Sequence, residues 1–194
     1  MNSREKILAA VKKNQPALEA RPSLQDIDAI KFDDAREKFK TVLEGIGGTV
    51  INANDTSEVV AFVNNHFKEG NRYVTTIATL GGIEQINSNE DAHKLEDVEV
   101  AIVNGAFAVA ENSAIWITAS SLKTRVLPFI CQHLVVVLQG VNIVHNMHEG
   151  YEKIAGENYD YGVFIAGPSK TADIEQSLVL GAHGPKSMTV FLLP

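Results

Sequence analysis

Hydroxyl, lysine and histidine side chains gather in one segment near the C-terminus, YGVFIAGPSKTADIEQSLVLGAHGP. An apolar run that predicts a strand stops at a glycine, and the apolar residues that follow have a roughly helical spacing. A helix that begins after a glycine turn offers free backbone N–H groups and the positive end of its dipole to an anion. The candidate ligand-binding residues of this segment are Gly167, Ser169, Lys170, Thr171, Asp173, Glu175, His183 and Gly184.

The same segment also fits an ordinary strand-to-helix turn that binds nothing. Asp173 and Gln176 have the spacing of a capping box, so the helix can begin at Asp173 and leave 169–171 as a loop that still lines a site. His183 can donate a hydrogen bond to a ligand, or it can stabilise a helix C-terminus through the dipole. The residues alone leave both interpretations open.

Two charged residues outside this segment are further candidates. Glu111 lies between two apolar runs, where a carboxylate can act as a general base, as a nucleophile or as an acceptor for a substrate hydroxyl. Arg125 could hold a carboxylate or phosphate with two hydrogen bonds. The alternatives are a structural ion pair for Glu111 and a solvated surface position for Arg125. Glu111 is therefore the candidate catalytic residue, and Arg125 joins the candidate ligand-binding residues.

No metal site or cofactor motif is evident. His145 and His148 have the i, i+3 spacing of one helical face, but neither an HExxH pattern nor a third ligand accompanies them. No G-x-G-x-x-G follows a strand, so the usual nicotinamide motif is missing. Cys131 is the single cysteine and lies in an apolar stretch, which predicts a buried thiol and not an iron–sulfur ligand set. We expect this chain to bind no metal and no cofactor.

The composition excludes several classes of partner. The chain of 194 residues has a net charge of −7 with scattered basic residues, which argues against nucleic acid and anionic membranes as partners. No apolar run reaches the roughly 18 residues of a membrane helix, and the N-terminus lacks the apolar core of a signal peptide. We therefore expect a cytoplasmic protein.

Strands alternate with helices along the chain, which predicts an α/β fold with a mostly parallel sheet and helices on both of its faces. Residues 1–30 are predicted to form an N-terminal helix with a capping box, followed by a linker arm. Residues 31–194 are predicted to form a single domain. In such sheets ligands bind beyond the carboxyl ends of the strands. The strands are expected at residues 50–51, 73–77, 98–103, 114–118, 134–138, 161–165 and 188–193.

The segment GPSKTADIEQSLVLGAHGP closely resembles the C-terminal motif of the lactate utilization protein C family, the YkgG-like proteins with a LUD domain. Further matches are the apolar run 106–110 before Glu111, Arg125 followed by a leucine–proline pair, and His133 opening an apolar strand. The resemblance covers the chain well from residue 98 onward. One departure is the turn after Glu111, where the family commonly has small residues and this chain has Asn112 and Ser113.

This resemblance implies the fold shared by ribose-5-phosphate isomerase, glucosamine-phosphate deaminase (NagB) and CoA transferases (the NagB/RpiA/CoA transferase-like fold). It also implies a component of an L-lactate utilization system, in which lactate is oxidised to pyruvate. The system would include cysteine-rich iron–sulfur partner proteins that carry the clusters, and this chain would bind a small anionic metabolite. An oligomer is possible. The alternatives are a stand-alone enzyme or binding protein for a phosphorylated or CoA-linked small molecule, and a non-catalytic assembly subunit.

Overall fold

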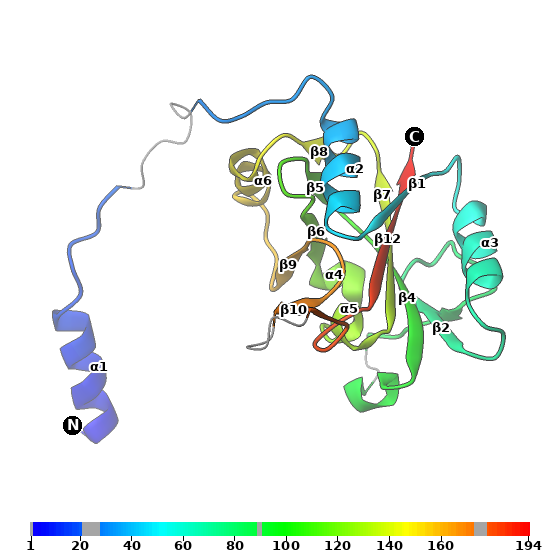
Figure 1. The fold of residues 1–194 in the computed structure, drawn as a ribbon. Coiled ribbons are helices and arrows are strands. Elements are labelled where there is room, and N and C mark those ends of the chain that lie inside the picture. The colour runs from blue at the N-terminus through cyan, green and yellow to red at the C-terminus, as the bar shows by residue number, and fades with distance from the viewer. Residues whose placement is uncertain (1, 21–27, 89–90, 173–177) are drawn as a thin grey trace.

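The structure, a computed structural model, describes residues 2–20, 28–88, 91–172 and 178–194 (Figure 1). Its centre is a six-stranded sheet in which every described pair of strands is parallel. The long apolar runs of the sequence form its inner strands, because a strand covered on both faces needs apolar side chains at successive positions. In spatial order the strands are β1 (Thr49–Asn52), β12 (Ser187–Leu193), β7 (His133–Gln139), β4 (Val98–Asn104), β2 (Arg72–Thr75) and β3 (Glu84–Gln85).

A second, smaller sheet packs on one face of the large sheet and contributes Ala108, Ile115 and Ile117 to the shared core. Ile115 of this sheet lies opposite Ile165 in an antiparallel pair, so the turn before Ile115 and the residues after Ile165 lie at the same end of the sheet. Its strands, in spatial order, are β8 (Ile143–Val144), β5 (Phe107–Val109), β6 (Ile115–Thr118) and β9 (Gly162–Ile165).

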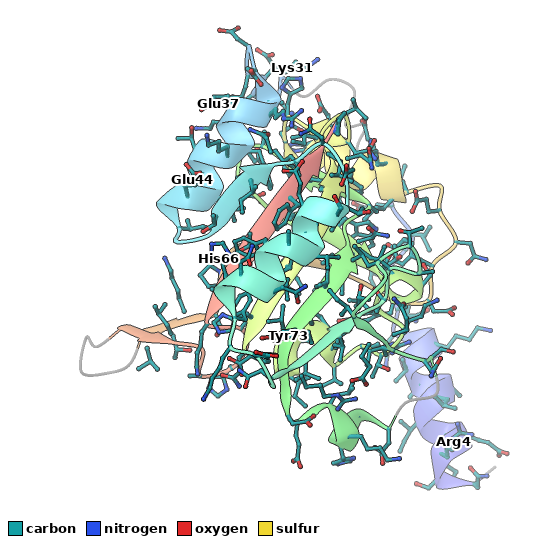
Figure 2. The ribbon with its side chains drawn as sticks, turned by 90° about the vertical axis from the view of Figure 1, so that its right-hand side faces the viewer. Arg4, Lys31, Glu37, Glu44, His66 and Tyr73 are labelled. Carbon is teal, nitrogen blue, oxygen red and sulfur yellow. The ribbon has the colours of Figure 1, made fainter. Side chains whose placement is uncertain are left out.

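Helices cover the remaining faces. On the side of the smaller sheet, α2 (Ala35–Gly45) buries Phe39 and Leu43, and on the opposite face α3 (Ser57–His66) buries Val59 and Val63. Figure 2 shows α3, with His66 labelled, in front of the large sheet. The predicted α/β fold with helices on both faces of a mostly parallel sheet is confirmed. The other helices are α4 (Ala119–Leu122), α5 (Leu127–Ile130), α6 (Met147–Ile154) and the 3₁₀ helix η1 (Ala92–Leu95).

The N-terminal helix α1 (Ser3–Lys13) has both hydrogen bonds of the predicted capping box, between Asn2 and Glu5. None of its residues is buried. The division of the chain into an arm and a domain at residue 30 stays a prediction. Within the described residues, no helix combines the length and the apolar character that crossing a bilayer requires.

The predicted helix after Gly167 is wrong where the structure describes the segment. Residues Lys170–Ala172 form β10 and residues Leu178–Leu180 form β11, and the two strands pair antiparallel with Thr171 opposite Val179. Figure 2 shows this ribbon extending outward beside the large sheet. β-Branched residues favour such cross-strand pairs, and here they outweigh the helical spacing of the leucines. Asp173 and Glu175 lie outside the described residues, and the argument from a helix dipole no longer applies.

Candidate functional site

A pocket of about 540 Å³ lies where the loop after β9 meets α5 and the loop before β12. We call it the Gly167 pocket. Five of the candidate ligand-binding residues line it: Gly167, Ser169, Lys170, His183 and Gly184. The other lining residues are mostly apolar, namely Ile46, Pro128, Phe129, Phe164, Ile165, Ala166, Pro168 and Pro185.

Gly167 is required by the backbone at this point. Its φ angle is +69°, a conformation that side chains with a Cβ rarely adopt. A Cβ at this position would also lie 2.8 Å from Cδ1 of Ile46, which follows α2. The glycine therefore lets the chain turn away from β9 while staying in contact with the end of α2.

Backbone hydrogen bonds join the two loops of the pocket. The N–H of Ser169 donates to the carbonyl oxygen of Pro185 at 2.9 Å, and the N–H of Gly181 donates to the carbonyl oxygen of Ser169 at 3.1 Å. A Cβ on Gly184 would lie 3.2 Å from Cβ of Ser169, so the loops touch closely at this glycine. The C-terminal motif thus folds back on itself and brings residues sixteen positions apart, Ser169 and Pro185, into one site.

The polar side chains of the pocket favour an anion. Lys170 and His183 are both exposed, and no ion pair of Lys170 is found among the described residues. A Cβ on Gly47 would lie 3.5 Å from Nζ of Lys170, so the ammonium group is held near the C-terminal end of α2. None of the described residues that line the pocket is acidic, although the chain carries 24 acidic and 17 basic residues. The pocket therefore has a cation and no described carboxylate to neutralise it.

Two other candidates lie apart from this pocket. Thr171 belongs to β10 and does not line the pocket. The guanidinium carbon of Arg125 lies 4.8 Å from the ring centre of Tyr161, in a cation–π contact. Tyr161 precedes β9, whereas Ile165 at its other end reaches the pocket, and four residues of strand span about 13 Å. Arg125 therefore lies near the end of β9 opposite to the pocket.

Glu111 has a structural partner in this fold. Its Oε1 accepts a hydrogen bond of 3.0 Å from the N–H of Met147, the first residue of α6. A carboxylate here compensates an unpaired N–H and the positive end of the helix dipole. Glu111 forms no ion pair with a described residue, so the ion-pair alternative is replaced by a helix-capping one. The β6–β9 register places this turn at the same end of the smaller sheet as Ala166, yet Glu111 does not line the pocket.

The turn after Glu111 is strained. Ser113 is fully buried and has a φ angle of +57°, in the region that favours glycine. Its hydroxyl donates to the carbonyl oxygen of Asn112 at 2.7 Å, and the side chain of Asn112 accepts from the N–H of Ala114 at 3.0 Å. The side chains of Asn112 and Ser113 thus stabilise a tight turn through hydrogen bonds to the backbone.

Two of the histidines outside the pocket have hydrogen-bond partners. His145 Nδ1 accepts a hydrogen bond of 3.1 Å from the N–H of Phe32, and His133 Nδ1 lies 2.7 Å from Oγ of Ser187. Burial lowers the pKa of His133, against an opposing contribution from Glu99. No group of three potential metal ligands occurs in the part of the chain that the structure describes.

The pocket does not lie beyond the carboxyl ends of the strands of the large sheet, where ligands usually bind in α/β proteins. It follows the carboxyl end of β9, as expected, but in the large parallel sheet it adjoins the segments before β1 and β12, at their amino ends. The reason is that β9 belongs to the smaller, largely antiparallel sheet. Sequence reasoning also missed Ile46 and Phe129, because these apolar side chains carry no local sign of a ligand.

The large parallel sheet, the second sheet and the pocket between their loops define an α/β protein with a ligand-sized cleft. The solved structure of a DUF162 family protein from Deinococcus radiodurans is similar in fold, with a TM-score of 0.64 and 15% identity over 86% of this chain and 100% of the other. Residues 71–193 match the LUD domain. The chain belongs to the LUD-domain family.

Several curated relatives carry names that refer to lactate. The chain is 26% identical to lactate utilization protein C of Shouchella clausii over 135 residues, which are 66% of this chain and 58% of that protein. It is 26% identical to lactate utilization protein C of Bacillus pumilus over 115 residues, 56% of this chain and 48% of that protein. The uncharacterized protein YkgG of Escherichia coli is 28% identical over 102 residues, 50% of this chain and 44% of that protein. The chain spans about half the length of the curated relatives it matches.

Proposed function

We propose that this chain is a component of an L-lactate utilization system and binds an anionic ligand in the Gly167 pocket. Its family and the names of its relatives support the role in lactate utilization. The single observation that supports the ligand is the position of Lys170 in a pocket without a described acidic side chain. The ligand's charge would be held by Lys170, with His183 and the hydroxyl of Ser169 as further hydrogen-bond donors.

We further propose that oxidation of L-lactate to pyruvate requires cysteine-rich iron–sulfur partner proteins and that no cluster is bound by this chain. Cys131, the single cysteine of the sequence, is 1% exposed, and burial raises its pKa to about 12. A protonated, enclosed thiol is a poor cluster ligand, because clusters are held by several thiolates. The electrons of the reaction would therefore leave through a partner.

A growth experiment tests the role in lactate utilization. Deletion of the gene in its native host should abolish growth on L-lactate as the only carbon source and leave growth on glucose unchanged. The wild-type gene should restore growth, and Lys170→Ala should restore it poorly because the pocket loses its cation. Lys68→Ala removes an exposed lysine from a loop after α3 and serves as the matched control. Normal growth of the deletion strain on L-lactate would refute the proposal.

Copurification tests the partner requirement. The protein isolated from lactate-grown cells should bring down cysteine-rich proteins with the visible absorption of iron–sulfur clusters. Lactate-dependent reduction of a dye should need those proteins as well as this chain. Lactate turnover by this chain alone would instead establish a stand-alone enzyme, the alternative function.

A further inference from the structure

The Gly167 pocket has two chemically different parts. One part is polar and contains the side chains of Ser169, Lys170 and His183. The other part is an apolar wall formed by Ile46, the end of β9 and the short helix α5. A ligand that satisfies both parts must carry a charge at one end and apolar surface at the other.

The size of the pocket exceeds the need of a three-carbon acid. Pockets that enclose organic ligands of ordinary drug size have volumes of about 300–1,000 Å³, and the 540 Å³ of this pocket falls within that range. L-lactate held at Lys170 would leave most of the pocket to water and most of the apolar wall uncovered. The volume therefore argues for a longer ligand than lactate.

Exposed apolar side chains continue this wall toward solvent. Phe129 lines the pocket and is 41% exposed. Leu180 of β11 is 51% exposed and lies directly opposite Lys170 in the β10–β11 ribbon. Residues directly opposite one another in an antiparallel pair point to the same face, so Leu180 lies on the same side of the ribbon as the lysine of the pocket. Apolar surface thus flanks the cation on two sides.

We propose that the Gly167 pocket binds an amphiphilic carboxylate, an acid with a medium-length alkyl chain. The carboxylate lies at Lys170, with Ser169 and His183 as hydrogen-bond donors. The alkyl chain covers the wall at Ile46 and Pro128 and reaches Phe129 at the pocket mouth. This inference rests on the proposed function in one respect, which is that the same pocket takes an anion.

Calorimetric titration of the full chain with L-lactate, hexanoate and octanoate tests the ligand class. Each methylene group that moves from water onto the apolar wall should strengthen binding by roughly fourfold when fully buried. Octanoate has two more methylene groups than hexanoate and should therefore bind up to about 16-fold more tightly, and L-lactate should bind most weakly. Octanoate binding that is no tighter than L-lactate binding would overturn the proposal.

Variants separate the two ends of the ligand. Lys170→Ala should weaken octanoate binding at least tenfold and leave the binding of neutral 1-octanol unchanged, since only the charged end loses its partner. Phe129→Ala should weaken octanoate binding and leave L-lactate binding unchanged. Lys68→Ala should alter neither. Octanoate affinity that is unchanged in both Lys170→Ala and Phe129→Ala would place its binding elsewhere and overturn the assignment.

The growth and titration experiments can refute the two proposals separately. A deletion strain that cannot grow on L-lactate, together with no chain-length dependence, would uphold the proposed function and refute the amphiphilic ligand. Normal growth of the deletion strain on L-lactate, together with the expected octanoate binding, would uphold the ligand and refute the role in lactate utilization.

Discussion

The N–H of Ser169 donates a hydrogen bond to the carbonyl oxygen of Pro185, and this bond joins the two loops that form the Gly167 pocket. The pocket therefore depends on how the chain turns on either side of Ser169. Gly167 lies two residues before Ser169 and adopts a backbone conformation open mainly to glycine. A substitution of Gly167 therefore tests how much this turn contributes to stability.

Gly167→Ala should destabilise the protein by about 2–4 kcal/mol, because it adds backbone strain and a Cβ that would lie 2.8 Å from Cδ1 of Ile46. Two control variants separate these causes. Gly70 has a φ of +92° with open space around its Cβ position, so Gly70→Ala should show the backbone cost alone, about 1–2 kcal/mol. Gly81 has neither feature, and Gly81→Ala should change stability little. Denaturant titration measures all three.

Lys123 has a φ of +60° and a ψ of −47° at the C-terminal end of α4. This sparsely populated conformation costs about 1–3 kcal/mol in a residue with a Cβ. Because the side chain is exposed, Lys123→Gly should raise the free energy of unfolding by about 1 kcal/mol. Lys123→Ala keeps the Cβ and should give no such gain. Equal stability of the glycine and alanine variants would show that Lys123 is not strained.

Much of the fold could be predicted from the sequence, because its strongest signals are local. The apolar runs of β4, β7 and β12 predict buried strands, and the stripe of Phe39 and Leu43 predicts the helix α2. The separation of β5, β6, β8 and β9 into a second sheet could not be predicted in the same way. That sheet depends on pairings between distant segments, such as Ile115 with Ile165, which no local pattern encodes.

The assignment of the ligand-binding residues stays a prediction, and one of the reasons for it is wrong. Ser169, Lys170 and His183 do line one pocket, but the helix that was to hold the anion is a β-ribbon in its described residues. The residue types carry information of their own, because small and polar residues suit a loop that lines a ligand site, whether a helix or a strand follows the loop. Arg125 was grouped with them by charge alone, and its cation–π contact with Tyr161 depends on a fold that charge does not reveal.

Glu111→Gln tests whether Glu111 is functional beyond capping α6. The amide oxygen of glutamine can still accept the hydrogen bond from Met147, so only the interaction of a charge with the helix dipole is lost. The free energy of unfolding should fall by about 0.3–1 kcal/mol, which a slightly lower melting temperature would show. If Glu111 also acts in the reaction, this variant should fail to restore growth on L-lactate while it stays folded. Full restoration of growth would assign Glu111 to capping alone.

The partly buried position of His133 predicts a loss of stability in acid. Burial lowers its pKa in the folded state below the usual value near 6.5, so the unfolded chain binds a proton at a higher pH than the folded chain does. The contribution of His133 to stability is thus fully present above pH ~6.5 and falls as the pH drops toward the folded-state pKa.

His133→Gln cannot take up this proton, and its free energy of unfolding should decline less than that of the wild type between about pH 7 and pH 5. His148 is exposed on α6, and His148→Gln serves as the control for the substitution itself. Parallel stability curves for the wild type and His133→Gln would contradict the prediction.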